Sequence, residues 1–373
     1  MTQAKPEARQ PAGRRTRPKV AVLFTSPEAV LDDYRRLMEL ADFESFLPKD
    51  VPTVLKVNVS WQHFYPACST TPWQLEGVIR TLQQAGYREL IAAHNSTVVV
   101  DARVGEVNNK HRAVQDRYGL TTVHLQDPDV RWVKFTPRRP FLVLDKVYPE
   151  GVHIPEILIG KNIIQLPTLK THVFTTMTGA MKNAFGGLLN ERRHYTHAVI
   201  HETLVDLLMI QQEIHPGLFA VMDGTFAGEG PGPRAMRFRV KNVILASGDL
   251  VALDATAARL MGFDPLSIKF IRLAHELGLG CGDPAEIEVV GADISGINWG
   301  FRADEDTFAS WGQKLIYWGP LKPLEKLLLR SVIAPWSYLA SNIYFNLYWY
   351  NRFGRARVRE ALKTPWGQLF LRY

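Results

Sequence analysis

Short apolar runs alternate along the chain with segments of helical periodicity. Runs rich in β-branched residues predict strands at 20–25, 53–59, 89–93, 141–144, 162–166, 218–222, 242–246 and 286–290. Apolar residues three or four positions apart predict helices at 72–84, 198–214, 250–261 and 266–277. Strands that are apolar throughout and alternate with helices are typical of parallel sheets covered on both faces. The pattern therefore predicts an α/β protein of two lobes, with mostly parallel sheets and a cleft between them.

Changes in this pattern divide the chain into four predicted parts. Residues 1–19 are predicted to be a disordered basic tail, 20–150 a first α/β lobe, and 151–304 a second α/β lobe. Residues 305–373 are predicted to be a helical extension rich in aromatic and basic side chains. Because functional residues in α/β folds gather at the carboxyl ends of strands, we expect the site in the cleft between the lobes.

The extension contains an uncharged stretch from 331 to 351, crowded with Trp336, Tyr338, Tyr344, Phe345, Tyr348, Trp349 and Tyr350. Four arginines follow within 352–359. The length would allow a membrane-spanning helix, but Pro335, two asparagines and so many aromatic rings favour an interfacial or partner-binding segment. Two interpretations stay open: a helical extension packed on the body, and a peripheral contact with a membrane or a protein partner.

The net charge of +7 belongs to the ends of the chain. Residues 1–19 carry +5 and residues 305–373 carry +6, so the remaining residues carry −4. A basic groove for nucleic acid in the body is therefore not indicated. The pair Arg14-Arg15 resembles an export signal, but the apolar run at 20–24 is too short for one and soon meets acidic residues. We expect a cytoplasmic protein, with peripheral attachment at the inner membrane face as an option for the extension.

The two cysteines, Cys68 and Cys281, lie far apart and lack any CxxC spacing. This count excludes a cysteine-ligated iron–sulfur cluster or a structural zinc site within one chain. It also favours a reducing compartment.

The densest group of chemically useful side chains lies between residues 170 and 197. This stretch follows a predicted strand, and its only acid is Glu191. Its candidate ligand-binding residues are Lys170, His172, Lys182, Asn183, Gly186, Gly187, Arg192, Arg193 and His197. Cations at the end of a strand create a positive field suited to a carboxylate or phosphate, and the paired glycines allow a ligand to approach the backbone. The alternative is a solvated basic loop.

Two aspartates are candidates for orienting these groups. Asp223 ends a predicted strand, where it could orient a lysine or histidine or close an Asx turn. Asp254 lies on the apolar face of the helix predicted at 250–261, where an ionised carboxylate requires a partner. We expect that partner to be Lys170, Lys182 or a histidine of the cluster; a structural buried ion pair is the alternative.

Several short motifs together resemble the domain of unknown function 362 family over residues 50 to 291. The matching segments are Lys56-Val57-Asn58, Thr70-Thr71-Pro72, Lys170-Thr171-His172, the run from Gly179 to Gly186, Asp223-Gly224, the run from Asp249 to Asp254, and Gly278-Leu279-Gly280. Many members of this family carry a ferredoxin-like domain with two iron–sulfur clusters, whose cysteines this sequence lacks. The resemblance implies a site built from these motifs and leaves the reaction open.

A further resemblance is to the lactate racemase family, whose members use a nickel–pincer nucleotide in a cleft between two α/β domains. Its counterparts here are His172, Lys182 and His197. Because the residues around Lys182 depart from that family's lysine motif, only metal ligation by the two histidines is carried over. The resemblance thus implies a metal or a nucleotide-derived cofactor.

Three functions follow from these observations. The first is an enzyme, an isomerase or oxidoreductase, that binds a small anion; His172, Lys182, His197 and Asp254 would be its catalytic residues, and the other cluster residues and Asp223 would hold the ligand. The second is a non-catalytic metabolite-binding or membrane-docking protein. The third, a redox protein related to the ferredoxin-fused members, is disfavoured by the cysteine count.

Overall fold

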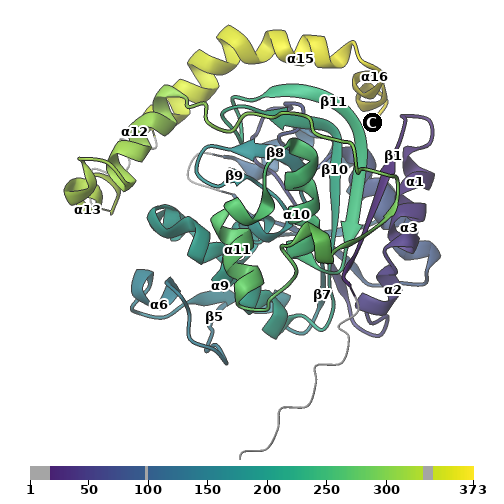
Figure 1. Ribbon diagram of the computed structural model, residues 1–373, viewed down its shortest axis with the longest axis horizontal. Coiled ribbons are helices and arrows are strands. Elements are labelled where there is room, and N and C mark those ends of the chain that lie inside the picture. Colours follow the sequence, from purple (N-terminus) through teal and green to yellow (C-terminus); the bar gives the residue numbers. More distant parts are fainter. Residues whose placement is uncertain (1–16, 97–99, 331–338) are drawn as a thin grey trace, which may run out of the picture.

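The computed structural model describes residues 17–96, 100–330 and 339–373. Its centre is one ten-stranded, mostly parallel sheet in the order β12-β1-β11-β10-β7-β2-β3-β4, with β8 pairing with β10 and with β9 (Figure 1). The strands are β1 (Lys19–Phe24), β2 (Thr53–Val57), β3 (Leu90–His94), β4 (Thr121–His124), β7 (Asn162–Leu166), β8 (Thr168–His172), β9 (Thr176–Met177), β10 (Leu218–Glu229), β11 (Arg237–Ser247) and β12 (Glu288–Gly291). A separate two-stranded sheet pairs β5 (Trp132–Lys134) with β6 (His153–Pro155).

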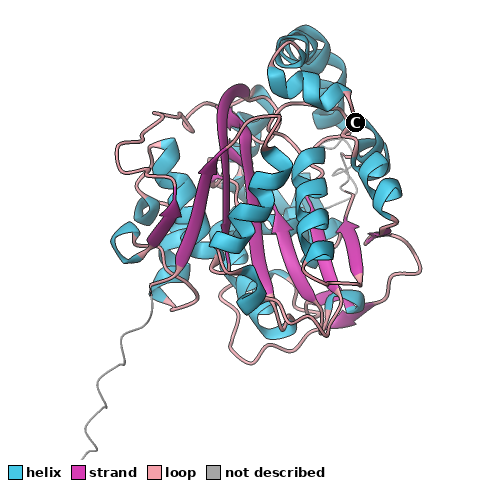
Figure 2. Cartoon of the chain, turned by 90° about the vertical axis from the view of Figure 1, so that its right-hand side faces the viewer, coloured by secondary structure: helices cyan, strands magenta, loops and turns pink. Residues whose placement is uncertain are grey.

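Helices cover both faces of the sheet (Figure 2). Alternate residues of β1 enter two different hydrophobic clusters, Val20 and Val22 one, Ala21 and Leu23 the other, because successive side chains of a strand point to opposite faces. One cluster lies under α9 (Ile200–Ile214), α10 (Leu250–Met261) and α11 (Lys269–Glu276), the other under α1 (Val30–Leu40) and α3 (Pro72–Gln84). The other short α-helices of the body are α2 (Phe43–Phe46), α4 (Ala102–Asn108), α5 (His111–Tyr118), α6 (Leu144–Val147), α7 (Ala180–Asn183) and α8 (Phe185–Leu188).

The predicted α/β class with a mostly parallel sheet and a helical C-terminal region is confirmed. Strands of both predicted lobes nevertheless join one sheet, because β1 pairs with β11 and β12 while β2 pairs with β7. Apolar periodicity does not record which strands pair. The strand predicted at 141–144 is wrong: its backbone N–H groups donate to the Asp206 carboxylate on α9 instead of to a neighbouring strand.

The C-terminal extension forms an arch along one side of the body (Figure 1). Its described elements are α12 (Phe308–Tyr317), α13 (Glu325–Arg330), the π-helix η6 (Ile343–Gly354), α15 (Arg355–Leu362) and α16 (Pro365–Leu371). The end of the arch is packed on the body: the Trp366 and Trp73 rings lie 5.2 Å apart, and Phe370 stacks on Phe64 at 3.7 Å. Trp336 and Tyr338 lie outside the described residues. None of the described helices combines the length and apolar character needed to cross a bilayer.

Candidate functional site: a cationic cavity

A cavity of about 290 Å³ opens where parallel strands β2, β3 and β7 end. Its wall includes Asn58 just after β2, Asn95 just after β3 and Pro167 just after β7. This is the edge of the sheet at which open α/β folds bind their ligands, because the loops there diverge and leave space.

The charge of the lining residues is strongly one-sided. Among those that the structure describes, none is an aspartate or glutamate. The basic side chains are Lys56, Lys170, Lys182, Arg193 and Arg234, accompanied by His172, His194 and His197. Since uncompensated cations lose hydration when they are buried, this composition favours an anionic ligand.

Lys170 lines the cavity from a strand rather than from the predicted loop. Strand β8 pairs with β10 and β9, and all five of its residues are buried. The Lys170 Nζ donates to the Cys68 carbonyl at 2.6 Å and to the Thr168 hydroxyl at 2.7 Å. Burial lowers the Lys170 pKa to about 8, because the charged form is the one that loses most hydration.

Lys182 is presented by the short helix α7, which Asp254 holds in place. The backbone N–H groups of Ala180 and Met181 donate to the two Asp254 oxygens at 2.6 and 3.1 Å. Gly179 immediately precedes this helix at φ +151°, and a Cβ there would lie 2.3 Å from the Asp254 Oδ1. A glycine is therefore required for the carboxylate to reach the start of α7.

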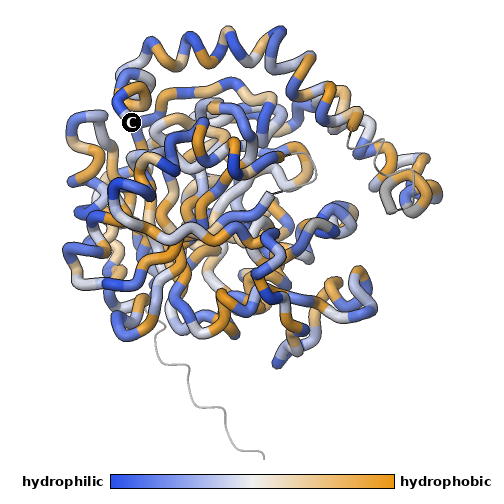
Figure 3. The backbone as a smooth tube through the Cα atoms, turned by 180° about the vertical axis from the view of Figure 1, so that it is seen from behind, coloured by the Kyte–Doolittle hydropathy of each residue, from blue (hydrophilic) through white to orange (hydrophobic). Residues whose placement is uncertain are grey.

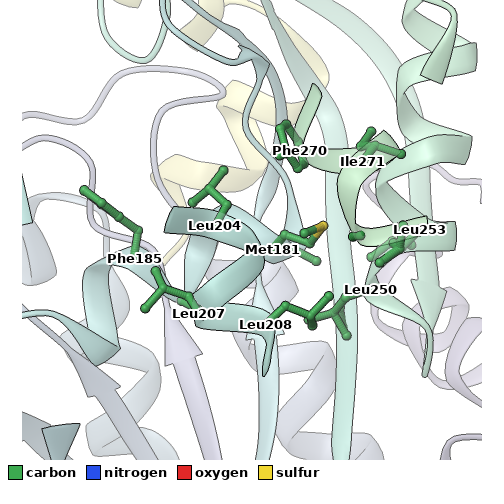
Figure 4. Packing of buried hydrophobic residues seen from close by; sticks show 14 of the residues in the cluster. Met181, Phe185, Leu204, Leu207, Leu208, Leu250, Leu253, Phe270 and Ile271 are labelled. Carbon is green, nitrogen blue, oxygen red and sulfur yellow. The ribbon is translucent and has the colours of Figure 1, made fainter. Parts of the chain in front are cut away.

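Apolar anchors on either side of Lys182 complete this support. Met181 and Phe185 lie among leucines of α9 and α10 in the buried cluster drawn in Figure 4. The Lys182 Nζ lies 5.4 Å from the centre of the Phe185 ring, and no described side chain forms an ion pair with it. Burial, then the charges of Lys170 and Arg193, lower the Lys182 pKa to about 7.

Lys56 approaches the cavity from β2. Its Nζ donates to the Val57 carbonyl at 2.7 Å, and burial, followed by the charge of Arg193, lowers its pKa to about 7. A Cβ at Gly187 would lie 2.9 Å from the Lys56 Cε, so this glycine makes room for the lysine rather than for a ligand. Gly186 does line the cavity.

The two histidines predicted to be catalytic have complementary hydrogen-bond partners. The Nδ1 of His172 accepts the Phe174 backbone N–H at 3.2 Å, so we assign its proton to Nε2. The Nδ1 of His197 faces the His194 carbonyl at 2.9 Å, so we assign its proton to Nδ1. Burial lowers the pKa of His172 well below its ordinary value and that of His197 to about 4, so both rings are neutral at pH 7.

These tautomers give the two rings different chemistry. His172 offers an Nε2–H donor, whereas His197 offers a free Nε2 lone pair. A metal-bound imidazole donates through its other nitrogen, and the His172 Nδ1, which faces an N–H group, is not placed to do so. The pair is therefore better suited to acid–base chemistry than to joint ligation of a metal.

Seven of the predicted site residues line the cavity together: Lys170, His172, Lys182, Asn183, Gly186, Arg193 and His197. Four others lie outside its lining. Gly187 packs on Lys56, and Arg192 is exposed and pairs with Glu150 at 3.3 Å. Asp254 bonds backbone amides instead of the expected cation, because its helix points the carboxylate at the start of α7.

Asp223 is the fourth residue outside the lining. Its Oδ2 accepts from the Tyr34 and Thr71 hydroxyls and from the Trp73 indole at 2.7 to 2.9 Å. Its Oδ1 accepts from the backbone and hydroxyl of Thr225. Asp223 thus ties α1 and α3 to strand β10, on the opposite side of the sheet from the α10 helix that carries Asp254.

The extension supplies lining residues that the sequence did not point to. They are Thr307, Ser310, Gln313, Tyr317, Ser341 and Phe345. The Tyr317 ring stacks on His197, with centres 5.8 Å apart and planes 20° apart. The arch therefore forms part of the cavity wall, and a contact between segments 120 residues apart leaves no local signal in the sequence.

Two other groups of described residues bring possible metal ligands within 4.8 Å of one another. They are His94, Glu106 and His124, all buried, and His275, Cys281 and Glu286, which are partly exposed. Neither group contains His172 or His197.

Comparison with known proteins places most of this site within a recognised domain. The family model described as Domain of unknown function (DUF362) matches residues 53–259. The chain belongs to this family. The DUF362 segment contains Lys56, β8, α7 and Asp254, whereas the extension lies outside it.

A curated relative of this DUF362 protein is the Thylakoid-associated protein sll1697 of Synechocystis sp. It is 32% identical over 219 residues, which cover 57% of this chain and 63% of that protein. The match thus spans just under two thirds of the relative's length.

Proposed function

We propose that the protein binds a small organic anion, a carboxylate or a phosphate, in the cationic cavity and catalyses proton transfer on it. The observation that carries this proposal is the lining of five basic side chains and three histidines, with no acid among the described residues. A volume of about 290 Å³ lies at the small end of ligand-binding pockets, which suits a metabolite of modest size.

The lysines that line the cavity explain why the ligand would be an anion. Lys56 and Lys182, with pKa values of about 7, are only partly protonated at neutral pH, whereas Lys170, with a pKa of about 8, is mostly protonated. A bound carboxylate or phosphate would favour their charged forms and accept hydrogen bonds from them. Binding energy would thus come from pairing cations that the surrounding protein groups compensate poorly.

The histidine tautomers support the catalytic part of the proposal. The neutral His172 Nε2–H would donate to a substrate carbonyl or carboxylate oxygen and stabilise negative charge that develops there. The His197 Nε2 would accept a proton from the adjacent carbon and return it, passing through an imidazolium. The electron pair left by the proton would move onto the oxygen held by His172 and the lysines. Such an isomerisation requires no oxidant or reductant.

Native mass spectrometry of the purified protein, together with titration by phosphate and by short hydroxy- and keto-carboxylates, tests the proposal. We expect one anion per chain and a rise in melting temperature with ligand concentration. His197→Gln should retain binding but abolish exchange of the substrate's α-proton with deuterated water. Binding without exchange in the wild type would leave the non-catalytic alternative, and no binding of any such anion would refute the proposal.

We also propose, as a second function, that the arch rests on a membrane with anionic lipids. Large apolar side chains are exposed along it, including Phe308 (75% exposed), Trp311 (52%) and Leu347 (65%). Hydrophobic and hydrophilic segments alternate along the arch in Figure 3, and Arg352, Arg355 and Arg359 are exposed. Apolar side chains next to basic ones are typical of interfacial helices, and the curated relative is named as thylakoid-associated. Co-sedimentation with anionic but not with neutral vesicles is the expected result.

A further inference from the structure

His94, Glu106 and His124 meet at the carboxyl ends of neighbouring strands. His94 is the last residue of β3 and His124 the last of β4, and the two are direct partners in the parallel register. Glu106 lies on α4, which follows β3. All three are buried, with exposed fractions of 0%, 1% and 6% for His94, Glu106 and His124.

Both histidine rings point their Nε2 atoms at one oxygen of the Glu106 carboxylate. The Nε2 of His94 lies 3.2 Å and the Nε2 of His124 lies 2.8 Å from the Glu106 Oε2. The ring centres are 4.7 Å apart and the planes are nearly perpendicular, at 83°. Two imidazole nitrogens and one carboxylate oxygen thus converge on one point.

The second nitrogen of His124 also lies on the side of a carboxylate. Its Nδ1 faces the Asp127 Oδ2 at 3.8 Å, so both nitrogens of this ring face carboxylate oxygens. A neutral ring has one proton and can satisfy only one of them. With its proton on Nε2, the neutral ring donates to Glu106 at 2.8 Å, and its Nδ1 lies beyond hydrogen-bond reach of Asp127. With its proton on Nδ1, the Nε2 lone pair is available to bind a cation placed between this ring and Glu106.

We propose that His94, Glu106 and His124 bind one divalent transition-metal ion of the zinc type. Two histidines and one glutamate form a ligand set of open zinc sites, in which water or substrate takes the fourth position. Ligand atoms each 2.0–2.1 Å from a tetrahedral ion lie roughly 3.3 Å apart, close to the observed separations. Asp127 would then accept from the Nδ1 of a metal-bound His124, the outer-shell partner that such ligands commonly have.

His94, Glu106 and His124 lie close to the cationic cavity. Asn95, the residue after His94, lines the cationic cavity, and Lys56 on β2 is the strand neighbour of Ala93. An ion here would add positive charge beside the anion cavity without belonging to its lining.

The other group of possible ligands, His275, Cys281 and Glu286, is less suited to a metal ion. Glu286 is exposed, His275 is half-buried, and the Cys281 Sγ lies 3.8 Å from the Glu286 carboxylate. Burial raises the Cys281 pKa to about 11, which disfavours the thiolate that a metal requires. His275 therefore serves as a control.

Titration of the full-length, chelator-treated protein with Zn²⁺ and with Co²⁺ tests the site. We expect one equivalent of Zn²⁺ per chain and the visible absorption of tetrahedral Co²⁺. Glu106→Gln and His124→Gln should each weaken Zn²⁺ binding by about 100-fold or more, since even the loss of outer-shell partners costs about 10- to 100-fold. Glu76→Gln on α3, another buried carboxylate, paired with Arg117, should leave Zn²⁺ binding unchanged.

Measurements on the wild type keep the test decisive if a variant fails to fold. Nitrogen NMR of the histidine rings should show the Nε2 atoms of His94 and His124 shifting on addition of Zn²⁺. Zn²⁺ binding far below one equivalent, or ring shifts absent at these two histidines, would overturn the proposal. So would Zn²⁺ binding that is lost in His172→Gln or His275→Gln but kept in Glu106→Gln. None of these readouts depends on anion binding in the cavity.

Discussion

The cavity and the arch are both rich in basic side chains, but they keep them in opposite surroundings. In the cavity, Lys56 and Lys170 are 3% and 1% exposed and no described lining residue is acidic, so each charge is expensive. Along the arch, Arg352 and Arg359 are exposed, where a charge costs little and indicates little. On the arch, the feature that costs free energy is the exposure of apolar side chains to water. Buried cations therefore point to an anion, whereas the arch points to an apolar surface with negative charge.

Removing the charge of one cavity lysine should produce the largest difference between the cavity and the arch. Lys182→Met keeps the length of the side chain and should weaken anion binding by about 100-fold, since a charge-assisted bond is lost. The melting temperature of the ligand-free protein should rise, because Lys182 has no described ion-pair partner to lose. Calorimetric titration and thermal denaturation measure both effects.

The matched control for Lys182 is Lys322→Met, which removes an exposed lysine of the arch. We expect neither anion affinity nor melting temperature to change in this variant. Equal losses of affinity in both variants would show that anion binding reflects overall charge and not the cavity.

The next largest effect concerns the support of Lys182. Asp254→Asn replaces one acceptor oxygen by an NH₂ group that cannot bond the N–H of Ala180 or Met181. We expect the free energy of unfolding to fall by about 1–3 kcal/mol, the cost of an unsatisfied buried group. Urea denaturation measures it, with the exposed Asp304→Asn as control. An unchanged stability would mean that Asp254 does not hold α7.

The buried aspartate also shows how far the sequence could lead. The apolar neighbours of Asp254 correctly indicated a buried carboxylate, and the helix boundaries 250–261 match α10. Its partners could not be predicted, because backbone N–H groups are present at every residue and leave no compositional signal. The same reason explains the strand wrongly predicted at 141–144, whose amides bond Asp206.

The candidate site was predictable where its residues are neighbours in sequence. Lys170, His172, Lys182 and Arg193 stand within 24 positions, and the fold brings them to one cavity. Lys56 was indicated only by the family motif that contains it, and Arg234 and Tyr317 reach the cavity through the course of distant segments in space. Such contacts depend on tertiary packing, which a single sequence does not encode locally.

A change of pH should alter anion binding in the cavity but not vesicle binding by the arch, and this effect should be smaller than those above. As pH rises from 6.5 to 8.5, Lys56 and Lys182 (pKa about 7) and Lys170 (pKa about 8) lose their protons, and we expect anion affinity to fall about tenfold. Vesicle binding through arginines should not change over this range. Titration calorimetry at three pH values gives the comparison.

The same lysines should make the ligand-free protein more stable at higher pH. Between about pH 7 and 10.5 the unfolded chain holds protons that these folded-state lysines have released, so the free energy of unfolding rises with pH. Asp254 acts in a lower window, because its pKa is raised to about 7 and its contribution falls as pH rises from about 4 to 7. An anion affinity that is flat across pH 6.5–8.5 would contradict the role of the lysines.

The smallest expected effect tests the outer face of the arch. Because α12 lines the cavity with Ser310 and Gln313, deleting the extension would disturb both regions, so single substitutions are required. Trp311→Ser removes an exposed ring, and we expect binding to anionic vesicles to weaken about three- to tenfold, as the loss of a partly buried apolar side chain predicts. Phe24→Ser, at an exposed phenylalanine on the body, is the control. Anion affinity should stay the same in both variants; if Trp311→Ser changed anion affinity and not vesicle binding, the arch would be a wall of the cavity and not a membrane contact.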